Sequence, residues 1–389
     1  MEMEKNTRGN PDREAEATKR WMAGLFIALF FMYNQGGALA QGETSARAAC
    51  ILEQETGRVL FSSNMHARLP MASTTKVMTA LLAIERGNPG DRVVCSGNAF
   101  GVPGTSIYLQ EGESLTLEQM LLGLMLASGN DAAVAIAEHI GGSLAQFVEM
   151  MNSRAREIGA VNTHFANPHG LPDDAHYTTA YDLALIAREA MKNEDFRALV
   201  STRQAGIPWQ GRTYQRQLTN KNRLLSDYEG ATGVKTGYTS KAGRCLVFGA
   251  VRDRLEVVGC VLSCGDWFDE AARLMDGCFD SYTMARVLAP TLSAGRIAVT
   301  GGKADSCGLC VMEEIRLPLL GGESAQVVLD IPGSVSAPVY PGMHLGTAQV
   351  VLGGKVYASC EVVAGERVDA DRITLDVRRI VARWVLKGT

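Results

Sequence analysis

Ser73 and Lys76 are the first side chains in this sequence whose types and spacing could do chemistry together. Residues three apart lie on the same face of a helix, so the hydroxyl and the amine would be neighbours. A serine becomes a useful nucleophile when an adjacent base removes its proton, and a desolvated lysine can be that base. Bringing the pKa of a lysine to near 7 costs roughly 4–5 kcal/mol, so the site must supply burial or a second positive charge.

Two further motifs follow along the chain, Ser-Gly-Asn at residues 128–130 and Lys-Thr-Gly at residues 235–237. Ser128 and Asn130 fall in a tight connection between two strongly apolar predicted helices, which would project polar side chains into a cleft from a rigid base. Each motif alone is weak evidence. The serine of the first motif could merely cap a helix, and Lys-Thr-Gly could be a hairpin turn.

The elements that must position these motifs form an α+β pattern. Residues 46–53 and 58–62 alternate around Glu-Thr-Gly, and residues 245–251 and 255–262 alternate around Arg-Asp-Arg, which predicts two antiparallel hairpins. Residues 201–234 are expected to form short strands and loops. Helices are expected at residues 73–86, 117–125, 132–140, 147–158, 180–192 and 267–282.

Composition divides the chain further. It changes near Leu288, after which short alternating segments rich in valine and glycine are typical of strands. We therefore predict four parts: a signal peptide at 1–40, a catalytic domain at 41–285, a small all-β domain at 286–376 and a terminal helix at 377–389.

The two ends of the chain predict export and contact with a membrane. A charged start, a short apolar run and Ala-x-Ala at residues 38–40 have the order of a secretory signal, cleaved after Ala40. An uncleaved anchor is the alternative. Residues 377–389 place valine, isoleucine and tryptophan opposite arginines and a lysine, which favours an amphipathic helix on the anionic surface of the cytoplasmic membrane. A terminal helix packed on its own domain is the other interpretation.

Charge and cysteine usage exclude some functions. A net charge of −4, with no basic block before the last residues, gives no electrostatic case for a nucleic-acid partner. Nine cysteines at irregular spacing do not form a disulfide framework, and at most one or two bridges are expected. A single Cys-x-x-Cys at residues 307–310 supports a zinc site only weakly.

The three motifs together, in this order and these contexts, resemble the penicillin-binding and serine β-lactamase superfamily. The resemblance is strongest to the low-molecular-weight D-alanyl-D-alanine carboxypeptidases. It implies a β-lactamase/transpeptidase-like α+β catalytic domain, with an antiparallel sheet flanked by helices, followed by a small β domain and an amphipathic helix. The stretches that carry it lie at residues 70–80, 126–131, 165–172, 219–225 and 233–239.

The resemblance implies a catalytic role for each motif. Ser73 would attack the carbonyl of the penultimate D-alanine in a peptidoglycan stem peptide and release the last D-alanine. Lys76 would act as the general base, and Ser128 and Asn130 would relay a proton toward the leaving amine. The oxyanion would lie on the backbone N–H groups of Ser73 and Tyr238.

The third motif would bind the substrate. Lys235 would lend positive potential to the site of Lys76 and, with Thr236, hold the terminal carboxylate of the substrate. Gly237 would let the substrate lie along the strand as an added strand does. The resemblance implies no metal or organic cofactor, and it implies that β-lactams acylate Ser73 and deacylate slowly. An enzyme of this kind acts at the extracytoplasmic face of the cytoplasmic membrane or in the cell wall.

Other functions and other residues compete with this interpretation. A β-lactamase on the same fold usually carries a Glu-x-x-Leu-Asn loop, whereas residues 165–170 read Phe-Ala-Asn-Pro-His-Gly. A D,D-endopeptidase would use the same residues but typically lacks the second domain, and filled catalytic positions argue against a non-catalytic penicillin sensor. His169 is expected to brace its loop rather than act as a base, and Asp131 and Asp174 to be structural.

Overall fold

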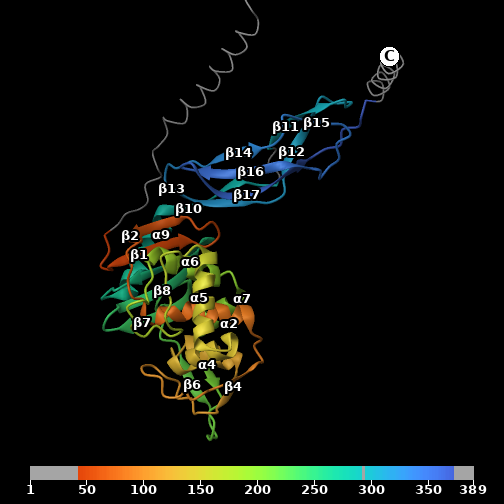
Figure 1. Cartoon of the computed structure of the whole chain (residues 1–389). Coiled ribbons are helices and arrows are strands. Elements are labelled where there is room, and N and C mark those ends of the chain that lie inside the picture. Colours follow the sequence, from red (N-terminus) through yellow and green to blue (C-terminus); the bar gives the residue numbers. More distant parts are fainter. Residues whose placement is uncertain (1–42, 291–293, 372–389) are drawn as a thin grey trace, which may run out of the picture.

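The computed structural model describes residues 43–290 and 294–371 (Figure 1). The predicted signal peptide at 1–40 and the predicted amphipathic helix at 377–389 lie outside the described residues. A part made of helices and one central sheet ends at α9, and an elongated β-rich part follows it (Figure 1). This is the α+β arrangement that the sequence predicts.

A five-stranded antiparallel sheet forms the centre of the first part, in the order β2-β1-β9-β8-β7. The two predicted hairpins, β1–β2 and β8–β9, are both confirmed. Strand β7 lies at one edge and carries the Lys-Thr-Gly motif. The strands are β1 (Ala48–Glu53), β2 (Val59–Ser63), β7 (Ala231–Thr239), β8 (Gly243–Arg252) and β9 (Leu255–Leu262).

Both faces of this sheet are buried, because successive side chains of a strand point to opposite faces. In β1, Ala48, Cys50 and Leu52 join the core with α2 to α7, whereas Ala49 and Ile51 join a second core with α9. The helices are η1 (Ala72–Thr75), α2 (Lys76–Arg86), α3 (Leu117–Met125), α4 (Asn130–Gly141), α5 (Leu144–Ile158), α6 (Ala180–Ala190), α7 (Glu194–Ser201), α8 (Leu224–Asp227) and α9 (Trp267–Ser281).

Side-chain caps fix where these helices begin. Thr116 and Gln119 form a reciprocal capping box at the start of α3. Thr179 likewise caps α6. The sequence did not predict α7, which begins after Asn193 and has only 8 residues. A helix this short depends on tertiary packing rather than on its own pattern.

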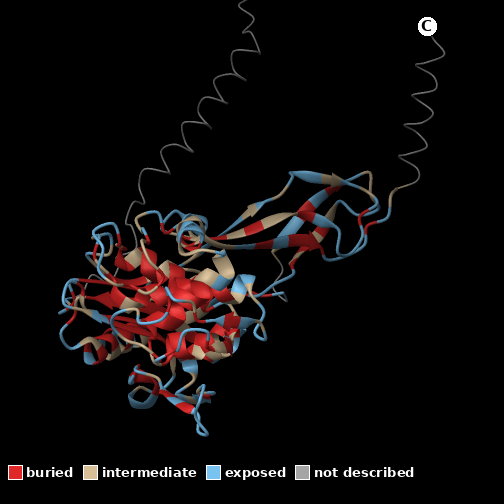
Figure 2. Ribbon diagram, turned by 60° about the horizontal axis from the view of Figure 1, so that its bottom comes forward, coloured by how far each residue is buried: buried red, intermediate tan, exposed pale blue. Residues whose placement is uncertain are grey.

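The β-rich part has its own core and a six-stranded sheet in the order β14-β16-β17-β12-β11-β15. Strand β10 follows α9 directly and therefore runs across the predicted boundary at residue 285. Figure 2 shows that buried residues are concentrated in the first part and are interspersed with exposed ones here. The strands are β10 (Tyr282–Leu288), β11 (Gly295–Thr300), β12 (Ser306–Val311), β13 (Ile315–Leu320), β14 (Gln326–Asp330), β15 (Ser334–Ser336), β16 (His344–Leu352) and β17 (Lys355–Ala364).

Two short ribbons complete the first part. Strand β3 (Arg92–Val94) pairs with β4 (Ser114–Thr116), and β5 (Gln204–Ile207) pairs with β6 (Arg216–Thr219). The second ribbon confirms the short strands expected within residues 201–234. Within the described ranges, no helix has the length and apolar character needed to cross a membrane.

Arg58 joins the two parts. Its Nη2 lies 2.7 Å from both carboxylate oxygens of Glu323, and its Nη1 donates to the carbonyl oxygen of Pro318. The guanidinium also lies 5.1 Å from the ring centroid of Tyr282. Since Arg58 begins the β2 side of the first hairpin and Glu323 follows β13, these contacts fix one part on the other.

Candidate active site

Ser73 lies in η1, a 3₁₀ turn, and not in the regular helix that the sequence predicts. The turn begins with Ala72, whose φ of +49° is in the left-handed region that most residues avoid. Two hydroxyls hold it: Thr74 Oγ1 donates to the carbonyl of Met71 at 2.6 Å, and Thr75 Oγ1 to that of Ala72 at 2.8 Å. The turn runs directly into α2, so Ser73 still faces Lys76 as its spacing predicts.

Lys76 is fully buried and its amine has three neighbours. Nζ lies 3.1 Å from Ser73 Oγ, 2.7 Å from Asn130 Oδ1 and 2.8 Å from the carbonyl oxygen of His169. The amide and carbonyl oxygens can only accept hydrogen bonds, whereas the serine hydroxyl can also donate one. A neutral amine has two protons and one lone pair. The two acceptors therefore use the protons, and the lone pair is left facing Ser73.

Electrostatics favour that neutral form. Burial holds the pKa of Lys76 well below its ordinary value, and the charges of Lys235 and Lys221 lower it further. The expectation that Lys235 lowers the pKa of Lys76 is therefore confirmed in direction. Burial is nevertheless the larger cause.

Asn130 is the first residue of α4, whereas the sequence places it in the preceding connection. Its Nδ2 donates to the carbonyl of Pro103 at 2.6 Å, and its backbone N–H to that of Thr105 at 2.7 Å. These bonds turn Oδ1 toward Lys76. Ser128, two residues earlier, is 4% exposed and has a left-handed φ of +67°. Strained backbone of this kind is concentrated at functional sites.

Asp131 is structural, as expected. Its carboxylate accepts hydrogen bonds from Ser106 Oγ at 2.6 Å, Ile107 N at 3.1 Å and Leu109 N at 3.0 Å. It therefore ties the loop that carries Pro103 to the start of α4. In this way Asp131 supports Asn130 without contacting Ser73 or Lys76.

Strand β7 passes close to the nucleophile turn. A Cβ built on Gly237 would lie 2.8 Å from the backbone nitrogen of Ser73, so only glycine allows this approach. Thr236 is buried and the side chain of Tyr238 is exposed. The three motifs, far apart in sequence, thus meet where β7, η1 and the start of α4 converge.

Lys235 is 1% exposed, and its Nζ donates to the carbonyl of Thr236 at 2.9 Å. Burial, followed by the charge of Lys221, lowers the pKa of Lys235 to about 7. Lys221 is exposed and affects both buried lysines. It lies in one of the stretches that carry the resemblance, but sequence reasoning gave it no role, because its proximity to β7 arises only in the fold.

The loop at residues 167–171 also packs on η1, where Gly170 approaches the carbonyl of Ala72. Asn167 Oδ1 accepts a hydrogen bond from Gly170 N at 2.7 Å, and His169 Nδ1 accepts one from Leu171 N at 3.2 Å. Burial, with the charge of Lys76, lowers the pKa of His169 to about 3. His169 therefore braces its loop, as expected, and the group that reaches Lys76 is its carbonyl rather than its imidazole.

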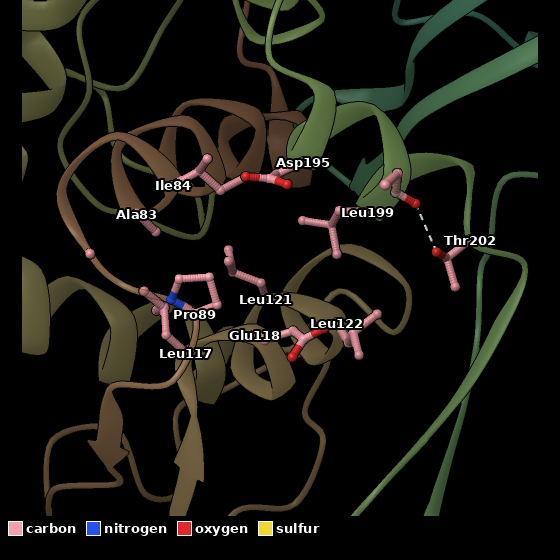
Figure 3. A pocket seen from close by; sticks show the side chains of 12 residues that line it. Ala83, Ile84, Pro89, Leu117, Glu118, Leu121, Leu122, Asp195, Leu199 and Thr202 are labelled. Carbon is pink, nitrogen blue, oxygen red and sulfur yellow. Dashed lines mark hydrogen bonds between the residues drawn. The ribbon is translucent and has the colours of Figure 1, made fainter.

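A separate apolar pocket of about 250 Å³ lies at the C-terminal end of α2 (Figure 3). Ile84, Leu121 and Leu199 line it, with Glu118 and Asp195 at its edge. Eleven residues of α2 span about 16 Å, so this pocket is far from Ser73. Its lining holds no serine, cysteine or lysine, and it is not where the chemistry occurs.

The cysteines and possible metal ligands of the described residues do not form a second functional site. All nine cysteines are free thiols, and every one except Cys310 is buried. Over residues 43–290 and 294–371, no cluster of three histidine, cysteine or acidic side chains could hold a metal ion. The Cys307–Cys310 pair lies in β12, far along the chain from the three motifs.

A serine facing a buried lysine, beside the edge strand of an antiparallel sheet with helices on both faces, defines a serine hydrolase with the penicillin-binding fold. The chain belongs to the D-alanyl-D-alanine carboxypeptidase family, whose sequence profile matches residues 35–265. This family membership confirms the resemblance drawn from the motifs.

Individual relatives agree with that assignment. The D-alanyl-D-alanine carboxypeptidase DacF of Bacillus subtilis is 33% identical over 385 residues, covering 94% of this chain and 99% of its own. The structure of penicillin-binding protein 5 from Haemophilus influenzae matches 84% of this chain and 98% of its own, at 25% identity and a TM-score of 0.69. A mutant DD-transpeptidase of Streptomyces, at 32% identity and a TM-score of 0.59, covers 61% of this chain and 99% of its own.

Proposed function

We propose that this protein is a serine D-Ala-D-Ala carboxypeptidase that removes the terminal D-alanine from peptidoglycan stem pentapeptides through an acyl-enzyme on Ser73. The observation that carries the proposal is the surroundings of Lys76. Its lone pair has one partner that can give up a proton, and that partner is Ser73 Oγ at 3.1 Å. Membership of the family supports the same reaction.

Acylation begins when Lys76 takes the hydroxyl proton and Ser73 Oγ bonds to the carbonyl carbon of the penultimate D-alanine. Negative charge then develops on the carbonyl oxygen. The backbone N–H groups of Ser73 and Tyr238 stabilise it. The close approach of Gly237 to the nitrogen of Ser73 supports this pairing of turn and strand.

The intermediate collapses when the bond to the last D-alanine breaks and its nitrogen gains a proton. That proton comes from Lys76, relayed by the Ser128 hydroxyl, while Asn130 keeps the amine of Lys76 in place. Water then attacks the acyl-enzyme, with Lys76 again as the base. Asn130 thus acts by holding Lys76, through the 2.7 Å contact of its Oδ1.

Lys235 and Thr236 hold the terminal carboxylate of the substrate. A carboxylate beside Lys235 stabilises its charged form and raises its pKa from the value of about 7 in the free enzyme. Binding therefore places a full positive charge near Lys76 and favours its neutral form. The exposed Lys221 adds to the positive potential that attracts the carboxylate.

The test is release of D-alanine from diacetyl-L-lysyl-D-alanyl-D-alanine by the purified mature protein. Release should be lost in Ser73→Ala and retained in Ser201→Ala, a matched change at an exposed serine whose hydroxyl donates to the carbonyl of Ala198. Active protein that releases no D-alanine, or release that survives in Ser73→Ala, would contradict the proposal.

β-Lactams should acylate Ser73 and leave slowly, which separates this enzyme from a β-lactamase. No carboxylate in the described part of the chain hydrogen-bonds to Ser73, Lys76 or Lys235, so none is placed to activate water for fast deacylation. The acyl-enzyme formed with a fluorescent penicillin should last much longer than one turnover of the peptide takes in the unlabelled enzyme. Rapid hydrolysis of the penicillin would favour the β-lactamase alternative. Cleavage of a cross-linked peptide dimer would reveal D,D-endopeptidase activity.

We also propose that the protein is exported and attaches to the outer surface of the cytoplasmic membrane through residues 377–389. The basic amphipathic pattern of that segment supports this, as does the signal-like order of residues 1–40. Deleting residues 378–389 should move the mature protein from the membrane fraction to the soluble fraction, and its first residue should be Gln41. An unchanged distribution, or a mature chain that retains residues 1–40, would contradict these two proposals.

A further inference from the structure

The direction of the bound substrate follows from the proposed function, on which this inference depends. The terminal carboxylate lies at Lys235 and Thr236, and the carbonyl under attack lies at Tyr238. Earlier residues of the substrate must therefore lie beside later residues of β7, as in an antiparallel strand. Each residue of an extended chain advances about 3.3 Å, so the third residue of the stem peptide comes next to the end of β7 at Thr239.

An exposed ion pair lies just beyond that point. Lys241, in the turn after β7, is bonded to Asp174, with Nζ and Oδ1 2.5 Å apart. The side chain of Lys241 is 46% exposed and that of Asp174 fully so. Asp174 is expected from the sequence to be structural rather than catalytic, and among the described residues its carboxylate hydrogen-bonds to Lys241 and to no buried group.

The ion pair links two segments that both pack on the nucleophile turn. The loop that leads to Asp174 packs on η1, since a Cβ on Gly170 would lie 1.9 Å from the carbonyl oxygen of Ala72. Strand β7 packs on the same turn at Gly237. Lys241 and Asp174 thus connect the two segments that flank the nucleophile.

The bonding of the ion pair also suits exchange with a ligand. Among the described residues, the Asp174 carboxylate and the Lys241 amine have each other as their only side-chain hydrogen-bond partners. The pKa of Asp174 is lowered by Lys241, so its carboxylate is charged at neutral pH. Exposed ion pairs contribute little to stability and open readily. A ligand with an ammonium and a carboxylate can replace the contact between Asp174 and Lys241 with two contacts of its own, one to each side chain.

We propose that Asp174 and Lys241 recognise the side chain of the third stem residue, a diamino acid. The Asp174 carboxylate accepts a hydrogen bond from the side-chain ammonium of that residue. When the third residue is diaminopimelate, the carbon that carries this ammonium also carries a carboxylate, and Lys241 binds that carboxylate. The pair is a specificity-determining contact of the carboxypeptidase, placed one residue along the substrate from the reacting carbonyl.

Three tripeptides test this, each ending in D-Ala-D-Ala and differing only in the first residue. One has lysine with a blocked side-chain amine, one has lysine with a free amine, and one has diaminopimelate. We expect kcat/KM to rise in that order. Asp174→Asn should lower it about five- to tenfold for the two substrates with a free amine, and Lys241→Gln should lower it for the diaminopimelate substrate only. The blocked substrate should be unaffected by either change.

A charge exchange separates recognition from a structural bridge. The double variant Asp174→Lys with Lys241→Asp keeps an ion pair, so a purely structural role would leave all rates as in the wild type. We expect the free-amine preference to be lost. Asp369→Asn, which opens an exposed pair with Arg367 in the β-rich part, is the matched control and should change no rate.

The two proposals fail in different ways. Equal effects of the Asp174 and Lys241 variants on blocked and free substrates, or a wild-type preference retained in the charge exchange, would overturn this inference. D-alanine release from the blocked substrate would still stand as evidence for the carboxypeptidase. No release from any of the three substrates would overturn the proposed function itself.

Discussion

The environment of a single amine, that of Lys76, determines what this site can do. The spacing of Ser73 and Lys76 was enough to predict their contact, because local geometry fixes residues three apart. The third neighbour, the carbonyl of His169, was not predictable. A backbone oxygen has no signature in the sequence, and the side chain that draws attention there is the imidazole, which faces other partners.

The two buried lysines should give the activity a pH optimum near neutrality. Lys76 must be neutral to act as a base, so kcat/KM should rise as the pH increases through its lowered pKa. Lys235 must be protonated to bind a carboxylate, and its pKa in the free enzyme is about 7, so kcat/KM should fall as the pH increases through that value.

Lys235→Arg tests the alkaline side of this profile. Arginine keeps its charge throughout the range, so the fall above neutral pH should disappear even if the maximal rate is lower. Measuring kcat/KM from pH 5 to 10 for both proteins gives the comparison. An identical alkaline fall in Lys235→Arg would mean that another group controls it.

At the scale of elements, sequence patterns predicted the structures that depend on neighbouring residues. They did not predict the structures that depend on contacts between distant segments. The hairpins β1–β2 and β8–β9 followed from the alternation of their residues. The 3₁₀ geometry of η1 did not, because packing against β7 and the loop at 167–171 shapes that turn. Those contacts join segments about 100 or more residues apart.

Gly170 should be essential to the nucleophile turn. Alanine there would place its Cβ 1.9 Å from the carbonyl oxygen of Ala72, at a φ of +91°. Backbone cannot give way as a flexible side chain can, so the turn that carries Ser73 must move. We expect Gly170→Ala to lower the rate of penicillin acylation at least tenfold.

Gly159→Ala is the matched control for that change. Gly159 has nearly the same φ, +92°, but nothing lies within 4 Å of its added Cβ. It should lose about 1–2 kcal/mol of stability from the left-handed conformation and keep its acylation rate. Equal acylation rates in the two variants, at a temperature where both are folded, would show that the loop does not position Ser73.

At the scale of the whole molecule, the residues that the structure describes form two cores on the central sheet and a third in the β-rich part. The change in composition near Leu288 falls where β10 ends and the third core begins. How the parts sit on each other could not be read from the sequence, because the contact between Arg58 and Glu323 joins residues 265 positions apart. Figure 1 shows the β-rich part extending away from α4 and β6.

Arg58→Met should weaken the attachment of the β-rich part without affecting the chemistry. The change removes the arginine from a Glu323 carboxylate that is 14% exposed and that keeps the N–H of Leu320 as a donor, which we expect to cost about 3 kcal/mol. Thermal unfolding should begin earlier, and release of D-alanine from a tripeptide should be unchanged at 25 °C.

The control for Arg58 is Arg296→Met, which removes an exposed ion pair with Glu366 inside the β-rich part. Exposed pairs contribute less than about 1 kcal/mol, so its unfolding should resemble that of the wild type. Equal unfolding of the two variants would mean that Arg58 does not hold the parts together.

The central claim is that the whole fold serves to make Ser73 a nucleophile, and covalent labelling tests it most directly. The mature protein, incubated with benzylpenicillin and digested, should show by mass spectrometry one added penicilloyl group, on the peptide that contains Ser73. Ser73→Ala should take up none. A label on any other residue, or equal labelling of Ser73→Ala, would contradict the account.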